Sequence, residues 1–116
     1  MAEQKNPNRV ISFFRFRMND LSAAEREEYN TTAERLFKIV SAMPGFISYR
    51  EYEARDGELL GITEWASAEA LAAWRENPDH RKAQELGRQV FYTEYDITVC
   101  TRLHGYSFKS DKRSAQ

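Results

Sequence analysis

The chain has 116 residues, enough for one hydrophobic core and too few for two ordinary domains. Its 17 basic and 18 acidic residues leave a net charge of -1, so it lacks the positive field that attracts nucleic acid or an anionic membrane. No apolar run approaches the roughly 20 residues of a spanning helix, and the polar start has no secretory pattern. We therefore expect a cytoplasmic protein that binds neither nucleic acid nor membranes.

The cysteine and histidine content is low. Cys100 is the one cysteine of the sequence, so it cannot form an intrachain disulfide, and its place in an alternating strand pattern predicts a buried, inert thiol. His80 and His104 are the two histidines. Because one cysteine and two histidines are too few for a typical transition-metal site, we expect no metal site.

The first half of the chain predicts a strand and a helix. Residues 1–9 lack apolar periodicity and are expected to form a disordered segment, whereas residues 10–18 alternate as a strand does. Ser22, with Glu25 three positions later, forms the capping-box pattern that starts a helix reaching about residue 42. The Pro44-Gly45 pair ends that helix.

The second half predicts a hairpin, an interrupted helix and a last strand. Residues 46–55 and 58–66 are two antiparallel strands, joined by Asp56-Gly57 in a type I′ turn. Ser67 caps a helix over residues 68–77, Pro78 interrupts it, and Asp79 restarts it. Residues 95–103 form the last strand, and residues 105–116 are expected to be a frayed tail.

The order β-α-β-β-α-β over residues 10–104 predicts one α+β domain of ferredoxin-like topology, with a four-stranded antiparallel sheet and a second helix broken at Pro78. Both helices should cover the same face. Because side chains alternate between the two faces of a sheet, the apolar strand residues cannot all share that face. We place one set on one face and a second set on the opposite face: Ile11, Phe13, Ile47, Tyr49 and Trp65 form the first set, and Phe14, Phe46 and Ile62 form the second. Because an apolar open face needs cover, we expect a homodimer packed sheet to sheet.

Two tryptophans and several tyrosines mark a candidate cavity. Trp65 ends the third strand and Trp74 lies on the following helix, where each could be a core anchor. With Tyr49 and Tyr52 among the nearby tyrosines, they also fit the wall of a cavity for a flat aromatic ligand.

His80 is the candidate acid-base group. It should face the sheet from its helix, either as a packing histidine or as a base for an acidic phenol. Gln84 lies one turn later on the same face and could reach the same ligand, whereas Arg88, a further turn on, points either at the cavity mouth or at solvent. Neither a nucleotide-binding glycine motif nor a zinc-protease motif is present.

Four short motifs resemble the antibiotic biosynthesis monooxygenase family: MPGFISY at 43–49, ITEW at 62–65, the helix from Ser67 to Trp74, and NPDH at 77–80. The resemblance covers about residues 10–104 and implies a dimeric α+β barrel with a cavity between sheet and helices. It also implies oxidation of a phenol or quinol by O₂ without a flavin or prosthetic metal. Trp65 would then be a cavity wall, with His80 or a tyrosine as proton acceptor.

The sequence departs from similar enzymes at two positions. Gly61 stands where phenol oxygenases of this kind carry an asparagine, and Gln84 stands where the haem-degrading branch carries a histidine. Three hypotheses follow: a cofactor-independent monooxygenase acting on an electron-rich aromatic, a haem-binding or haem-degrading protein that uses His80, and a dimeric small-molecule-binding module without catalysis.

Overall fold

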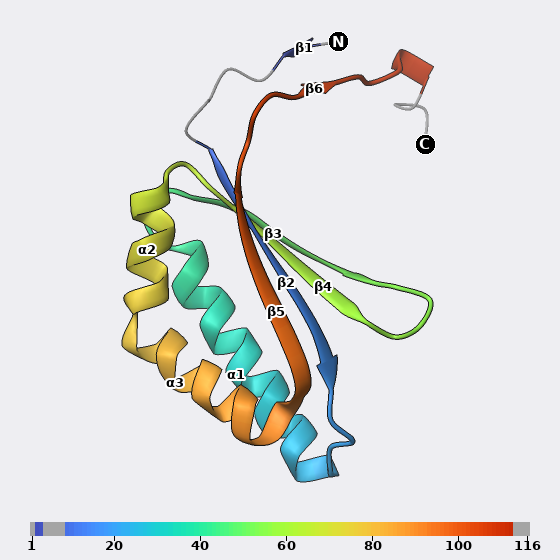
Figure 1. The fold of residues 1–116 in the computed structure, drawn as a ribbon, viewed down its shortest axis with the longest axis vertical. Coiled ribbons are helices and arrows are strands. Elements are labelled where there is room, and N and C mark those ends of the chain that lie inside the picture. Colours follow the sequence, from blue (N-terminus) through green and yellow to red (C-terminus); the bar gives the residue numbers. More distant parts are fainter. Residues whose placement is uncertain (1, 4–8, 113–116) are drawn as a thin grey trace.

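The computed structural model describes residues 2–3 and 9–112. The four-stranded sheet has the order β3-β4-β2-β5, and every neighbouring pair is antiparallel. Its strands are β2 (Val10–Met18), β3 (Phe46–Glu53), β4 (Leu59–Trp65) and β5 (Tyr92–Thr101). The helices α1 (Ala23–Ser41), α2 (Ala68–Glu76) and α3 (Pro78–Leu86) all lie on one face of this sheet, and the other face is uncovered (Figure 1). The predicted ferredoxin-like α+β fold is confirmed.

Local sequence signals set the helix ends. The Ser22 hydroxyl accepts a hydrogen bond from the Glu25 amide, and the Glu25 carboxylate accepts one from the Ser22 amide, so the predicted capping box is present. Asn77 separates α2 from α3, because its Oδ1 accepts from the amides of Asp79 and His80 while Pro78 begins the new helix. A short π-helix, Gly87–Phe91, follows α3 and leads into β5.

The hairpin turn differs from the predicted type I′. That turn needs positive φ at both central residues, but among the described residues only Gly45 and Gly57 have positive φ. Instead the Gly57 amide donates to the Ala54 carbonyl and the Ala54 amide donates to the Glu58 carbonyl. The strands are thus joined by a three-residue loop with its glycine in the left-handed region, a common alternative to the two-residue turn.

Apolar side chains occupy both faces of the sheet, but their division differs from the prediction. Trp65 pairs with Val10 and with Phe46, and therefore lies on the helix side. Tyr49 also lies on the helix side, whereas Ile62 pairs with Phe13 on the open side. The cause on β3 is a register shift between Phe46 and Ser48, which leaves one extra residue in that strand.

The core lies at the end of the sheet where α1 and α2 meet it. Five buried residues form its centre, and they are Val10, Val40, Trp65, Leu71 and Trp74. Trp65 is 0% exposed and meets the ring of Phe46 edge-on. The predicted wall residue Trp65 is therefore a core anchor.

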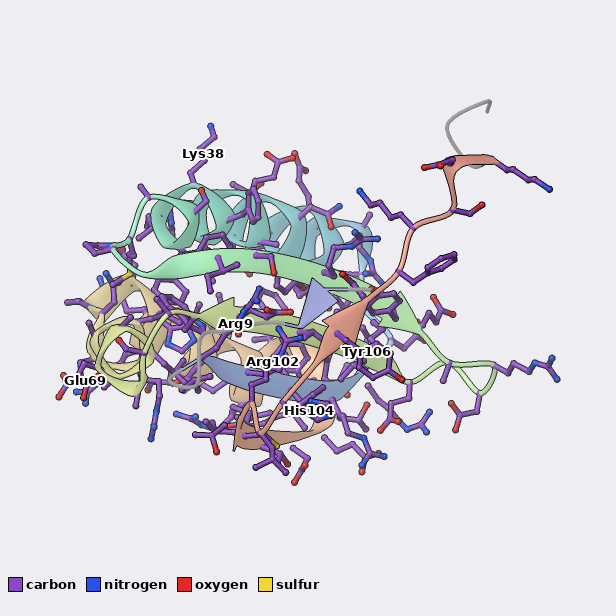
Figure 2. The ribbon with its side chains drawn as sticks, turned by 90° about the horizontal axis from the view of Figure 1, so that it is seen from above. Arg9, Lys38, Glu69, Arg102, His104 and Tyr106 are labelled. Carbon is purple, nitrogen blue, oxygen red and sulfur yellow. The ribbon has the colours of Figure 1, made fainter. Side chains whose placement is uncertain are left out.

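The segment after β5 returns toward the start of the chain. The Arg102 amide donates to the Arg9 carbonyl, and β6 (Tyr106–Ser107) pairs with β1 (Ala2–Glu3). Figure 2 shows Arg9, Arg102, His104 and Tyr106 at this end, while Lys38 on α1 and Glu69 on α2 point outward. No helix in the described part of the chain is long and apolar enough to cross a bilayer.

Candidate functional site

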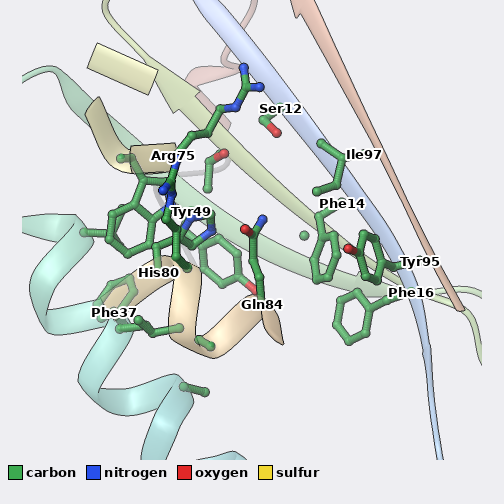
Figure 3. A pocket seen from close by; sticks show the side chains of 18 of the residues that line it. Ser12, Phe14, Phe16, Phe37, Tyr49, Arg75, His80, Gln84, Tyr95 and Ile97 are labelled. Atoms are coloured by element: carbon green, nitrogen blue, oxygen red, sulfur yellow. The ribbon is translucent and has the colours of Figure 1, made fainter. Parts of the chain in front are cut away.

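A cavity of about 1020 Å³ lies between the helices and the sheet. Its sheet side is made by alternate residues of all four strands, among them Phe14, Tyr49, Gly61 and Ile97. In the view of Figure 3, Phe37, Tyr49 and His80 lie on one side, Phe14, Phe16, Tyr95 and Ile97 lie on the other, and Gln84 lies between them. The lining is thus largely aromatic and aliphatic with a few polar groups, as in small-molecule sites.

Of the seven residues predicted for the site, four line this cavity: His80, Trp74, Tyr49 and Gln84. The other three do not. Trp65 is buried in the core, and Tyr52 lies on the opposite face of the sheet with the Arg50 guanidinium over its ring. Arg88 donates to the Tyr95 hydroxyl at 3.0 Å from outside the lining.

His80 packs against Trp74 at the second-helix side of the cavity. Their ring centroids are 4.4 Å apart, with an angle of 34° between the planes. Burial lowers the pKa of His80 from 6.5 to about 4, and the nearby charge of Arg75 lowers the pKa further, although a hydrogen bond with the Arg75 backbone opposes the shift. His80 is therefore neutral at pH 7.

The Nδ1 atom of His80 is buried and has no hydrogen-bond partner among the described residues. A neutral imidazole carries one N–H donor and one lone-pair acceptor. In the tautomer that carries its proton on Nε2, the unpartnered Nδ1 is the acceptor. The cavity thus contains a buried acceptor that a ligand hydroxyl could satisfy.

A tyrosine cluster forms the other polar part of the cavity. The Tyr49 hydroxyl donates to the Glu51 carboxylate at 2.5 Å, and Tyr29 and Tyr92 are close enough for the charge of Glu51 to act on them. Burial is the largest of the effects that raise the pKa values of Tyr29, Tyr49 and Tyr92. These phenols are therefore neutral hydrogen-bonding groups at pH 7.

Four charged lining residues were not predicted from the sequence: Glu51, Arg75, Glu76 and Arg81. Glu51 could have been found by strand alternation, because it lies two residues after Tyr49 on the same strand. Arg75 follows Trp74 in the sequence, and no sequence signal distinguishes it from the charged residues that ordinarily cover the exposed side of a helix. In the part of the chain that is described, no group of three or more His, Cys, Asp or Glu residues could hold a metal ion.

Comparison with known proteins identifies the family. Residues 9–86 match the antibiotic biosynthesis monooxygenase family. The chain belongs to this family. The resemblance drawn from the four motifs is thereby confirmed.

Two curated relatives come from Bacillus subtilis and Pyricularia oryzae. The chain is 34% identical over 71 residues to the uncharacterized protein YqjZ of Bacillus subtilis. This alignment covers 61% of this chain and 62% of that protein. The chain is 31% identical over 75 residues to a protein of Pyricularia oryzae named jasmonate monooxygenase ABM, covering 63% of this chain and 35% of that one. The matched region thus spans less than two thirds of either relative.

Solved structures share the fold. SnoaB, a cofactor-independent oxygenase from Streptomyces nogalater, superposes with a TM-score of 0.65 at 18% identity, over 82% of this chain and 93% of SnoaB. A protein from Mycobacterium tuberculosis superposes with a TM-score of 0.69 at 23% identity, over 85% of this chain and 99% of that one. At these identities the likeness concerns the fold alone.

Proposed function

We propose that the protein is a cofactor-independent monooxygenase that oxidises an electron-rich phenol or quinol with O₂. The observation that carries this proposal is an aromatic-lined cavity in which His80, packed against Trp74, presents a buried nitrogen without a hydrogen-bond partner among the described residues. Family membership and the fold shared with SnoaB, whose name describes a cofactor-independent oxygenase, support the reaction class.

The reaction balances without an added reductant. A phenol with a hydrogen para to its hydroxyl reacts with one O₂ to give a para-quinone and one water, and the substrate supplies all four electrons. One oxygen atom enters the ring and the other leaves as water. The protein has to bind the ring, orient its hydroxyl and assist its ionisation, because an electron-rich phenolate can pass an electron to O₂ directly.

In this proposal His80 orients the substrate. Because its pKa is lowered to about 4, the imidazole is a weak base at pH 7 and a good hydrogen-bond acceptor. One hydroxyl of the substrate donates to Nδ1, the ring stacks among the aromatic side chains, and Gln84, one turn after His80, contacts the same ligand. Trp74 fixes the imidazole plane through the ring contact.

Oxygen uptake tests the proposal. A dihydroxynaphthalene with a free para position is incubated under isotopically labelled O₂, with His80→Ala as the variant and His104→Ala as the matched control. We expect one labelled oxygen in the quinone and a rate about fivefold lower in His80→Ala, since a hydrogen bond contributes about 1 kcal/mol. Rates that match the no-protein reaction across a panel of phenols would remove the proposal's support, and ligand binding without oxygen uptake would favour a non-catalytic binding module.

Haem binding is the alternative that His80 also supports, because its free nitrogen could ligate iron. Among the described residues, no ion pair involves Arg75 or Arg81, and their guanidinium groups in the lining suit the propionates of a haem. Titration with haemin tests this alternative. A Soret band that shifts in the wild type and not in His80→Ala would support it, and a free-haem spectrum would exclude it.

The proposed assembly is a homodimer through the open face of the sheet, in the cytoplasm. Apolar residues lie side by side on this face in the strand register, where Phe13 opposes Ile62 and Ile11 opposes Cys100. Ion pairs flank them, with Arg9–Glu64 toward one end and Arg17–Asp56 toward the other. An apolar centre with a charged rim is the usual build of a protein interface.

A further inference from the structure

The cavity holds a carboxylate that the proposed reaction has not yet used. Glu51 lies on β3 two residues after Tyr49, and both residues line the cavity. The Tyr49 Oη donates to the Glu51 Oε2 at 2.5 Å. No ion pair joins Glu51 to another of the residues that the structure describes. The phenol of Tyr49 is therefore the group that engages this carboxylate.

The sheet fixes Tyr49 over the cavity floor. Tyr49 and Glu51 pair with Thr63 and Gly61 on β4. A Cβ atom on Gly61 would lie 3.3 Å from the Tyr49 Oη and 3.2 Å from Cε1 of its ring. Because Gly61 has no side chain, the phenol lies across it and brings a hydroxyl to this part of the site.

The Tyr49 hydroxyl is set as an acceptor toward a ligand. A phenol has one proton to donate, and here that proton goes to Glu51. The lone pairs of Oη remain, and donation to a carboxylate makes the oxygen a better acceptor. Burial and the Glu51 contact both raise the pKa of Tyr49, so a free tyrosinate does not form at neutral pH.

We propose that Tyr49 and Glu51 together remove the proton of the substrate hydroxyl; this rests on the proposed function. The O–H bond of the substrate breaks and its electron pair stays on the substrate oxygen. The proton moves to the Tyr49 Oη while the proton of Tyr49 moves to the Glu51 Oε2. The products of this step are a phenolate, a neutral tyrosine and a neutral carboxylic acid. Tyr49 touches the substrate, and Glu51 acts through it.

The location of Glu51 suits this role. Its side chain is exposed on the edge strand, so it can return the proton to water after each turnover. Its negative charge also disfavours ligands that arrive as anions. The pair therefore favours an uncharged phenol over an aromatic carboxylate in this part of the cavity, and it complements His80, whose buried nitrogen can accept a hydrogen bond from a second hydroxyl of the substrate.

Rates with a weakly acidic phenol test the step. We expect kcat/KM at neutral pH to fall about 100-fold in Glu51→Gln and in Tyr49→Phe, the usual contribution of a positioned base. The loss in Glu51→Gln should shrink as the pH rises toward the pKa of the phenol, because an ionised substrate needs no base. Matched controls are Glu53→Gln on the same strand and Tyr52→Phe on the opposite face, and both should keep the wild-type rate. A wild-type rate in Glu51→Gln at all pH values would overturn the proposal.

Binding without oxygen separates this inference from the proposed reaction. Under nitrogen, the wild type should bind a naphthol about tenfold more tightly than its methyl ether, since only the naphthol has a proton to donate. The preference should shrink in Tyr49→Phe and persist in Tyr52→Phe. If no phenol is oxidised but this pattern holds, the oxygenase proposal fails and the hydroxyl-accepting role of the pair stands. An unchanged preference in Tyr49→Phe would overturn that role, whatever the rates show.

Discussion

The phenol oxygen of Tyr49 lies 3.3 Å from the point where a Cβ atom on Gly61 would stand. Gly61 stands where similar phenol oxygenases carry an asparagine, so this chain lacks that polar side chain. The structure places a hydroxyl from the neighbouring strand over the same residue, hydrogen-bonded to Glu51. The polar character of this part of the cavity is therefore kept by a different side chain.

Gly61→Ala should disturb this arrangement with little effect on the fold. The new methyl group meets the far end of a tyrosine ring, which can shift by a few tenths of an ångström, so we expect a loss of less than about 1 kcal/mol in the free energy of unfolding. The preference for a naphthol over its methyl ether should fall, because the Tyr49 hydroxyl moves from Glu51. Denaturant unfolding and anaerobic binding measure the two effects.

A double-mutant cycle provides the control for Gly61→Ala. If the methyl group acts through the Tyr49 hydroxyl, adding Gly61→Ala to Tyr49→Phe should change the binding preference no further. Additive losses in the double variant would show that Gly61 affects the ligand by another route.

The sequence predicted the elements well because their signals are local. The Ser22 cap and the interruption at Pro78 each involve residues a few positions apart, and the structure contains both. The side chains of the site depend on a longer relationship. One extra residue between Phe46 and Ser48 reverses the alternation of β3, and no sequence signal marked it.

How deeply a residue is buried also could not be predicted from a local sequence pattern. Trp65 was predicted to be a cavity wall, but its pairing with Val10 and Phe46 places it at the packed end of the sheet. Cys100 was predicted to be buried, and in the single chain it is exposed on the open face. Both outcomes depend on what covers each face of the sheet, which alternation alone cannot specify.

His80 should make the stability of the protein depend on pH. Its pKa is about 4 in the folded chain and 6.5 when unfolded, so between these values the unfolded state binds more protons. The free energy of unfolding should therefore decrease as the pH falls from about 6.5 to about 4, by up to about 3 kcal/mol in total. Denaturant unfolding at several pH values measures the slope.

Asp and Glu carboxylates also titrate at the acid end of this range. The informative quantity is therefore the difference between variants in how the free energy of unfolding changes with pH. His80→Gln should be less sensitive to acid than the wild type. Equal slopes in wild type and His80→Gln would contradict the buried, neutral state of His80.

Gly45 and Gly57 should differ in their tolerance of alanine. Both have positive φ, 84° and 93°, so alanine at either position should cost about 1 kcal/mol from backbone strain. At Gly45 the new Cβ would also lie 2.6 Å from the Cβ of Ala70, whereas at Gly57 nothing lies within 4 Å. We expect Gly45→Ala to lose about 2 kcal/mol more than Gly57→Ala, as overpacking usually does. Equal losses in urea unfolding would argue against close contact between this turn and α2.

The open face of the sheet should bind a second copy of the chain. Light scattering at micromolar concentration should give a dimer mass for the wild type and a monomer mass for Phe13→Asp, because an unpaired carboxylate would be buried in the apolar centre of the interface. Ala24→Asp, on the exposed side of α1, is the matched control and should remain dimeric. Cys100 gives a second measurement: as the partner of Ile11 on this face, it should react slowly with a thiol reagent in the wild type and rapidly in Phe13→Asp. A monomeric wild type with a freely reactive Cys100 would mean that this face stays open to solvent.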